Sequence, residues 1–190
     1  KGIVKKILRY IKAIFVERVI YKVLIKNITN LSSRKERFTK IYESNFWGSM
    51  ESKSGVGSEI AQTSNIRKNL LNIFSKYKIK SIVDAPCGDF NWMKELKFEK
   101  NINYIGVDIV DKLIIKNNNL YRKKNISFVV ADICNDKIPN CDLLFARDFL
   151  FHLSFEDINK FLKNILNTQY KYLLTTTYDN KDIFRNENIK

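Results

Sequence analysis

Short apolar runs alternate with helical patterns over the second half of the chain. From residue 80 onward, runs of apolar residues are separated by longer stretches in which apolar residues recur every three or four positions. The short runs predict strands buried on both faces, and the longer stretches predict helices. Strands separated by helices predict an α/β fold with an open, mostly parallel sheet and helices on both faces. The predicted strands cover residues 80–85, 103–109, 126–133, 141–148 and 171–178.

Helical periodicity predicts the connections between these strands. A short helix is expected to start at 90–96, and longer helices are expected at 110–121 and 154–166. Ser154 stands at the N-cap of the last helix, with Asp157 at the capping-box position. Residues 59–78 also have helical spacing, with apolar residues on one face at Ile60, Ile66, Leu70, Ile73 and Phe74.

The N-terminal segment predicts an amphipathic helix over residues 3–25. Apolar residues recur at helical spacing, and Lys5, Lys6, Arg9 and Lys12 occupy much of the remaining surface. Three roles fit this pattern: a cover for the core, a peripheral contact with a membrane surface, or a partner-binding helix. We favour the cover and expect an N-terminal helical extension over residues 1–45.

Residues 46–58, FWGSMESKSGVGS, are the richest stretch in small residues. Glycines and serines of this kind predict a loop. The loop is either a flexible linker or a mobile lid in which Trp47 is the packing anchor. We therefore expect a lid loop and helix over residues 46–79, followed by a core over residues 80–190.

Composition narrows the class of protein. The 190 residues are 45% hydrophobic, which suits one globular domain, and no apolar run is long enough to cross a membrane. The net charge of +14 is compatible with nucleic acid, but lysine is scattered along the whole length, as compositional bias alone would produce. A nucleic-acid partner is therefore not expected. Three cysteines without a CxxC pair predict no metal site, and a reduced, cytoplasmic setting is expected.

Acidic residues follow four successive predicted strands. Asp84, Asp108, Asp132 and Asp148 each stand at or near a strand's carboxyl end. In an open parallel sheet these ends meet at one edge, where ligands bind beside the point at which strand order reverses. Gly88 lets the backbone turn sharply and approach a ligand closely. The pattern therefore predicts a ligand site at this edge.

The ligand expected at this edge is a nucleoside that carries positive charge. An acid at the end of the second strand can accept hydrogen bonds from a ribose diol. The phosphate-binding pattern GxGxxG is absent, and acids on both sides of Gly88 would repel a pyrophosphate. S-adenosyl-L-methionine, an adenosine with a cationic sulfonium, fits these requirements, whereas a nicotinamide dinucleotide does not.

Four motifs in order resemble those of class I S-adenosylmethionine-dependent methyltransferases, which have a Rossmann-like core. VDAPCGDF resembles the first motif, although Pro86 and Phe90 replace two of its usual glycines. YIGVDI, VVADI and DLLFARDFLFHL resemble the second, third and fourth motifs. The resemblance implies that the cofactor is held by Asp84, Ala85, Pro86, Gly88, Asp89, Asp108, Ile109, Asp132, Ile133 and Arg147.

A narrower resemblance links the chain to a bacterial methyltransferase group associated with surface-polysaccharide modification. It is carried by NFWGSMESKSGVGSE, DAPCGDFNWM, RDFLFHLSFEDI and YLLTTTY. It implies that the loop before the core closes over the cofactor or the acceptor. Ser54, Ser58 and Arg67 would then meet an anionic group. The class I fold has two strands after the fifth, so we expect the natural chain to continue beyond Lys190.

The candidates for the acceptor side are Arg147, Asp148 and His152, the single histidine. Each has a structural alternative: Arg147 pairing with an acid, Asp148 capping a helix, and His152 packing under the sheet edge. The function expected first is O-methylation of a small-molecule, saccharide or phosphorylated acceptor. An RNA methyltransferase and a non-catalytic nucleoside-binding protein are the alternatives, and the oligomeric state is left open.

Overall fold

The computed structural model describes residues 20–176, and the chain divides into two compact units, Lys1–Phe46 and Trp47–Lys190. In the first unit, residues 20–29 are helical, which agrees with the end of the predicted helix 3–25; the earlier part of that helix lies outside the described residues. Helix α2 (Arg34–Ser44) lies within the helical extension expected over residues 1–45, although it was not predicted as a separate helix. Its signal is a capping box, in which the Ser33 side chain accepts a hydrogen bond from the Glu36 backbone and the Glu36 carboxylate accepts one from Ser33.

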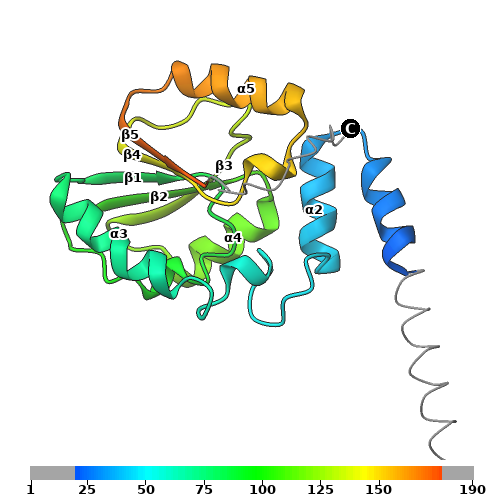
Figure 1. The fold of residues 1–190 in the computed structure, drawn as a ribbon, viewed down its shortest axis with the longest axis horizontal. Coiled ribbons are helices and arrows are strands. Elements are labelled where there is room, and N and C mark those ends of the chain that lie inside the picture. Colours follow the sequence, from blue (N-terminus) through cyan, green and yellow to red (C-terminus); the bar gives the residue numbers. More distant parts are fainter. Residues whose placement is uncertain (1–19, 177–190) are drawn as a thin grey trace, which may run out of the picture. The chain divides into compact units, whose positions relative to one another are not determined.

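The second unit is built on a five-stranded sheet in which every pair of neighbouring strands is parallel. The strand order is β3-β2-β1-β4-β5, so the order reverses beside β1 (Figure 1). The predicted parallel α/β sheet is confirmed. The strands are β1 (Ser81–Asp84), β2 (Asn103–Asp108), β3 (Ile126–Val130), β4 (Cys141–Ala146) and β5 (Tyr170–Thr175).

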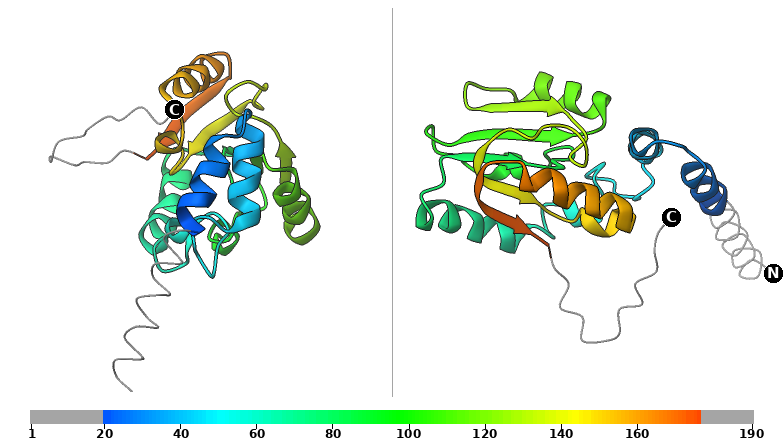
Figure 2. Two further views of the ribbon diagram at one scale, coloured as in Figure 1. Left: turned by 90° about the vertical axis from the view of Figure 1, so that its right-hand side faces the viewer. Right: turned by 90° about the horizontal axis from the view of Figure 1, so that it is seen from above.

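Helices cover both faces of this sheet, as predicted. Helix α5 (Phe155–Leu166) lies on one face, and α3 (Ser64–Lys76) and α4 (Asp111–Tyr121) lie on the other (Figure 1). A further view shows α5 and α4 on opposite sides of the strands (Figure 2, left). Ser154 caps α5, since its side chain accepts a hydrogen bond from the Asp157 backbone at 3.1 Å.

Helix α3 begins five residues later than the predicted range of 59–78. The Thr63 hydroxyl donates to the carbonyl oxygens of Glu59 and Ile60, at 2.9 and 3.2 Å, which holds the preceding residues in turns. The predicted apolar face is confirmed in part: Leu70 and Phe74 are buried, Ile66 and Ile73 are half-buried, and Ile60 precedes the helix.

The predicted helix at 90–96 is wrong. The structure has only a short 3-10 turn, η2 (Met93–Glu95), at this place. Phe90 has a left-handed backbone with φ of 59°, which interrupts any helix starting there. Phe90, Trp92 and Met93 are buried and only Lys94 and Glu95 of this segment are exposed, so most of the segment packs into the core.

An aromatic cluster fills the core beneath the β1 turn. The Phe90 ring packs against the rings of Tyr104, Tyr121 and Phe128, with centroids 5.0–5.3 Å apart. Gly106 makes room for this cluster, because a Cβ there would lie 2.6 Å from the Phe128 ring. The cluster therefore packs the segment that follows β1 against side chains of β2 and β3.

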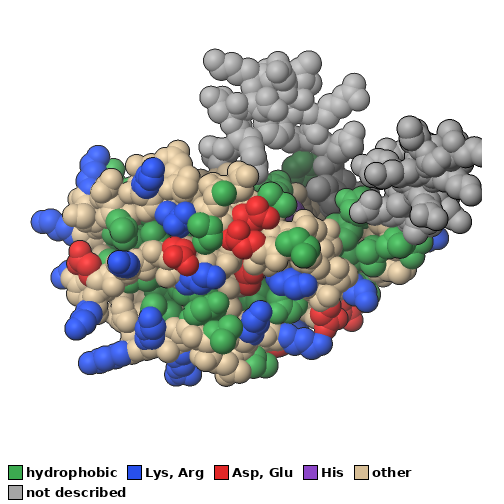
Figure 3. All heavy atoms as spheres, turned by 90° about the horizontal axis from the view of Figure 1, so that it is seen from below, with side chains coloured by type: hydrophobic (Ala, Val, Ile, Leu, Met, Phe, Trp, Pro, Cys, Tyr) green, Lys and Arg blue, Asp and Glu red, His purple; other side chains and the backbone are tan. Residues whose placement is uncertain are grey.

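The face of the second unit drawn in Figure 3 carries dispersed charge. On the face drawn in Figure 3, lysine and arginine side chains are scattered, with acidic and apolar side chains between them. Within residues 20–176, no helix has both the length and the apolar content needed to cross a bilayer.

Candidate functional site

Hydrogen bonds to β2 and to α4 hold the turn after β1 at Gly88. The Gly88 N–H donates to Oδ2 of Asp108 at 3.1 Å, and its carbonyl accepts from the side-chain amide of Asn117 at 2.8 Å. Gly88 has a φ of +54°, a conformation that glycine adopts without strain. The end of β2 and the inner face of α4 therefore set the shape of this turn.

Asp108 ends β2 and is only 8% exposed. Its second oxygen, Oδ1, accepts from the Val110 N–H at 3.0 Å. The Ile109 N–H is a third backbone donor to this carboxylate, which has about four acceptor positions, so capacity for a further donor remains. Burial raises the pKa of this carboxyl to about 6, and the hydrogen bonds from Val110 and Gly88 oppose that rise.

Asp84 ends β1 and is more deeply buried, with 3% exposure. The Tyr104 hydroxyl donates to its Oδ2 at 2.5 Å. Burial raises the pKa of Asp84 to about 7, while the hydrogen bond from Tyr104 lowers it and the nearby Asp108 raises it further. The adjacent Ala85 is fully buried and donates its N–H to the Phe145 carbonyl at 2.8 Å, whereas Pro86 is half-buried.

The carboxylate of Asp89 binds the loop that was predicted to be a lid. It accepts hydrogen bonds from the Ser52 hydroxyl at 2.9 and 3.1 Å, from the Lys53 N–H at 2.7 Å and from the Ser54 hydroxyl at 3.2 Å. The Asp89 N–H in turn donates to the Ser54 hydroxyl at 2.9 Å. Asp89 therefore joins the turn after β1 to this loop, and its predicted role in holding the cofactor stays a prediction.

The rest of this loop is joined to the core through Glu51 and Asn91. The Asn91 side-chain amide donates to the Glu51 carboxylate at 2.6 Å and to the Ser58 carbonyl at 3.0 Å. The Glu51 carboxylate also accepts from the Ile60 N–H at 2.8 Å. Apart from the 3-10 turn η1 (Val56–Ser58), the predicted loop has no regular structure.

Arg67 was predicted to meet an anionic group together with Ser54 and Ser58. Its guanidinium donates to the Ile60 carbonyl at 2.8 Å. Its Nε is buried and has no hydrogen-bond partner among residues 20–176. Ser54 is bound to Asp89, so the structure gives these residues separate protein partners.

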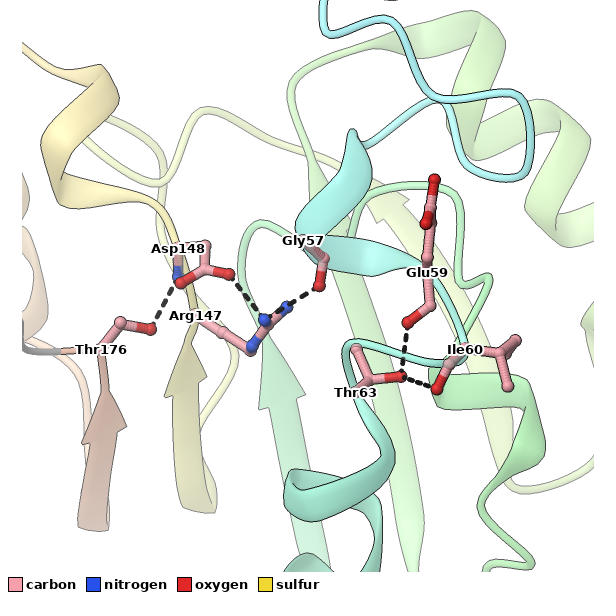
Figure 4. A network of polar contacts seen from close by, with 7 residues as sticks. All are labelled: Gly57, Glu59, Ile60, Thr63, Arg147, Asp148 and Thr176. Atoms are coloured by element: carbon pink, nitrogen blue, oxygen red, sulfur yellow. Dashed lines mark hydrogen bonds and ion pairs between the residues drawn. The ribbon is translucent and has the colours of Figure 1, made fainter.

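Arg147 reaches from the end of β4 to the same loop (Figure 4). Its Nη2 donates to the Gly57 carbonyl at 3.0 Å and forms an ion pair with Asp148 at 2.7 Å. The guanidinium also lies 5.5 Å from the centre of the Trp92 ring, within cation–π range. The alternative in which Arg147 pairs with an acid is therefore realised, with its neighbour Asp148 as the acid.

Asp148 and His152 lie beside this arginine. The Asp148 N–H donates to the Thr176 hydroxyl at 2.9 Å, and its side chain pairs with Arg147. The His152 ring, in the 3-10 turn η3 (Leu150–His152), contacts the Trp47 and Phe151 rings at centroid distances of 5.0 and 4.2 Å. The residue is exposed overall, but loss of ring hydration lowers its pKa below the usual value, an effect that Asp148 opposes.

Asp132 lies in a turn of its own after β3. Its two oxygens accept from the Cys134 N–H at 3.0 Å and from the Asn135 side chain at 2.9 Å. The adjacent Ile133 is buried, and its carbonyl accepts from Asn164 of α5. Ile109, which follows Asp108, is half-buried. Hydrogen bonds thus link the ends of β1, β2 and β4 to one another, while the roles of Asp132 and Ile133 in holding the cofactor stay predictions.

Sequence reasoning missed several residues of this region, among them Ser52, Asn91 and Asn117. Asn117 had a detectable signal, because it stands one helical turn after Leu113 and Ile114 on the buried face of α4. A buried amide on an apolar face requires a partner, here the Gly88 carbonyl. Within residues 20–176, no group of acidic, histidine or cysteine side chains has the arrangement of a metal site.

The fold is that of class I methyltransferases. No family model and no curated protein matches the chain. Among solved structures, the N-methyltransferase NodS from Bradyrhizobium japonicum WM9, in complex with S-adenosyl-L-homocysteine, matches with a TM-score of 0.55 at 13% identity. This match covers 70% of this chain and 67% of NodS.

Two further solved structures have the same fold. The methyltransferase domain of bacterial CtHen1 matches with a TM-score of 0.52 at 16% identity, over 62% of this chain and 66% of that one. Phosphoethanolamine N-methyltransferase 1 of Haemonchus contortus, in complex with phosphoethanolamine and S-adenosylhomocysteine, matches with a TM-score of 0.52 at 17% identity. This match covers 72% of this chain and 30% of that one. The chain therefore spans about two thirds or less of these structures.

Proposed function

We propose that this chain is an S-adenosylmethionine-dependent methyltransferase acting on a small-molecule acceptor. The observation that carries the proposal is Asp108 at the tip of β2, with its buried carboxylate bonded to the Gly88 turn and to the backbone that follows β2. This carboxylate stands beside β1, where the strand order reverses. Solved structures with the same fold contain S-adenosylhomocysteine, which agrees with this assignment.

The residues at this edge suit the proposed cofactor. The remaining acceptor capacity of Asp108 suits a ribose hydroxyl. The half-buried Ile109 next to it offers an apolar contact for adenine. Asp108 and Asp84 give the edge negative potential once the pH exceeds their raised pKa values of about 6 and about 7, and this potential favours a sulfonium and opposes a pyrophosphate. When bound, the cofactor supplies an electrophilic methyl group.

In this proposal the protein acts mainly by alignment and by exclusion of water. The loop from Trp47 to Ile60 covers the ends of β1 and β4 through Asp89 and Arg147. Fixing a nucleophile in line with the transferred methyl is worth on the order of 7–11 kcal/mol in well-oriented reactions. Shielding the reacting groups from water also strengthens the electrostatic interactions between them.

The acceptor side of the proposal consists of Arg147, Asp148 and His152. The lowered pKa of His152 keeps its imidazole neutral near pH 7, the form that can take a proton from an acceptor hydroxyl. Arg147 supplies positive charge for an anionic acceptor such as a phosphorylated sugar. These groups support O-methylation of a saccharide or phosphorylated compound, in line with the resemblance to the polysaccharide-modifying group.

Isothermal titration calorimetry with S-adenosylmethionine, S-adenosylhomocysteine and NAD tests the cofactor. We expect the first two ligands to bind and NAD not to bind. Asp108→Asn, which keeps the shape of the side chain and removes its charge, should lose about tenfold or more in affinity. Binding of NAD alone, or full affinity in Asp108→Asn, would overturn the assignment.

Turnover with a panel of acceptors tests the reaction. The panel contains sugar nucleotides, phosphorylated sugars and primary amines, and transfer is followed with methyl-labelled cofactor. We expect labelled product from the sugar acceptors. Label in the amines alone would show that the reaction is N-methylation and not O-methylation. Cofactor binding without transfer to any acceptor would favour a non-catalytic nucleoside-binding protein.

A further inference from the structure

The loop from Trp47 to Ile60, called the lid from here on, is attached on both sides of the point where strand order reverses. Asp89 follows β1, and its carboxylate binds Ser52, Lys53 and Ser54 of the lid. Arg147 follows β4, and its guanidinium binds the Gly57 carbonyl of the lid. Since β1 and β4 are neighbours in the sheet, the lid crosses the edge at which the proposed cofactor binds.

The lid also occupies the space that a side chain at Gly88 would need. A Cβ on Gly88 would lie 2.1 Å from the Ser54 hydroxyl oxygen and 3.0 Å from the Ser54 Cβ. The absence of a side chain at Gly88 therefore serves to admit the lid. Ser54 fills this position while it exchanges hydrogen bonds with Asp89 in both directions.

Polar contacts, more than apolar burial, hold the lid in place. Met50 is 99% exposed and Val56 is 49% exposed, whereas Ser52 is 1% exposed. Three lid donors converge on the single carboxylate of Asp89, and hydrogen bonds to a charged acceptor are the strongest kind available to them. A segment that depends on a few polar contacts opens at lower cost than one buried in an apolar core.

We infer that Asp89 is a positioning residue: its carboxylate is the latch that holds the lid over the switch point and thereby limits cofactor exchange. The gating part of this inference rests on the proposed function, while the latch itself does not. In the closed state, Asp89 acts through Ser52 and Ser54 on the lid. Release of these donors frees the lid to open, and exchange of S-adenosylmethionine for S-adenosylhomocysteine follows.

Limited digestion with trypsin tests, in the absence of any ligand, whether Asp89 holds the lid closed. Lys53 is exposed, and its N–H is bonded to Asp89, so cleavage after Lys53 reports on opening of the lid. Asp89→Ala should be cleaved there about tenfold or more faster than wild type. Because Asp89→Ala also changes the β1 turn, the double variant Ser52→Ala/Ser54→Ala, which removes donors from the lid, is measured beside it and should show the same direction.

The matched control is Asp142→Asn. Asp142 accepts from the Lys80 and Ser81 N–H groups at 2.8 and 3.0 Å and pairs with Lys171, but it lies at the amino-terminal ends of β1 and β4, the opposite edge of the sheet. This control should not increase cleavage after Lys53. Equal cleavage of wild type, Asp89→Ala and the double serine variant would overturn the latch.

Stopped-flow displacement of S-adenosylhomocysteine tests the gating. Its dissociation rate should rise about tenfold in Asp89→Ala and in the double serine variant, with kcat reduced more than KM is changed. A faster rate in Asp89→Ala alone would overturn gating and indicate direct contact between Asp89 and the ligand. Wild type that fails to bind S-adenosylhomocysteine would refute the proposed function, and the trypsin result would still decide the latch.

Discussion

The Gly88 N–H donates a hydrogen bond to Oδ2 of Asp108 at 3.1 Å, which joins two motifs that stand 20 residues apart. One belongs to the turn after β1 and the other ends β2. The same carboxylate is the proposed ribose acceptor, so the turn and the ligand would share one acid. Any change in the charge of Asp108 is therefore expected to affect both the turn and ligand binding.

The affinity for S-adenosylhomocysteine is expected to fall as the pH drops through about 6. Burial raises the Asp108 pKa to about 6 from an ordinary value of 3.8, and protonation removes a charged acceptor for the ribose hydroxyls. Well below the pKa, the association constant should fall about tenfold per pH unit. Calorimetry between about pH 5 and about pH 8 measures this slope. Asp108→Asn should lack it; an unchanged slope in that variant would assign the titration to another group.

In the ligand-free protein, the contribution of Asp108 to stability is expected to fall as the pH rises, whereas its contribution to ligand affinity rises with pH. A raised pKa in the folded state means that the native protein holds this proton more tightly than the unfolded chain does. Its contribution to the free energy of unfolding is therefore complete below about pH 4 and is lost as the pH rises through about 6. Urea denaturation of wild type and Asp108→Asn over this range should show a difference that depends on pH. A constant difference would contradict the shift.

Tyr104→Phe is expected to destabilise the protein more at pH 8 than at pH 5. The Tyr104 hydroxyl donates to Asp84, whose pKa is raised to about 7, so the bond becomes charge-assisted above that pH. Its loss should reduce the free energy of unfolding by about 1.5–3 kcal/mol at the higher pH and by about 1 kcal/mol at the lower pH. Tyr121→Phe, in the same aromatic cluster, is the control measured by urea denaturation. Equal losses at both pH values would show that Asp84 does not titrate in this range.

Gly106→Ala is expected to destabilise the core by about 1–3 kcal/mol. The added Cβ would lie 2.6 Å from the Phe128 ring and 3.0 Å from the Cys87 sulfur. A smaller side chain at position 128 should relieve part of this overlap. Thermal denaturation of Gly106→Ala, Phe128→Leu and the double variant tests this prediction. The loss of stability in the double variant should be smaller than the sum of the losses in the two single variants. Strict additivity would place the strain elsewhere.

His152→Gln is expected to remove the acidic limb of the pH–rate profile. In wild type, kcat should rise with pH through a pKa below 6.5, because the neutral imidazole is the form that accepts the proton. Lys160→Gln, a change on the exposed side of α5, is the control and should keep the limb. If His152→Gln also keeps it, the ring has only a packing role against Trp47 and Phe151.

The sequence by itself determined the sheet and its edge. Continuous apolar strands bounded by helical patterns specify parallel pairing, and parallel pairing brings the strand ends with Asp84, Asp108 and Arg147 to one edge. These inferences depend on periodicity and on short-range turn chemistry, both of which are visible in a linear chain. The same local information failed at 90–96, where the left-handed backbone of Phe90 and the burial of Phe90, Trp92 and Met93 accompany a short turn in place of the expected helix.

Only the tertiary structure decided what the polar residues at this edge bind. The bond between Ser52 and Asp89 spans 37 residues, and the bond between Arg147 and Gly57 spans 90. A serine or an aspartate has the same donors and acceptors wherever it stands, so its sequence position does not specify its partner. Packing of the lid against the ends of β1 and β4 selects that partner, because a buried polar group must be satisfied by whatever group the fold brings within reach.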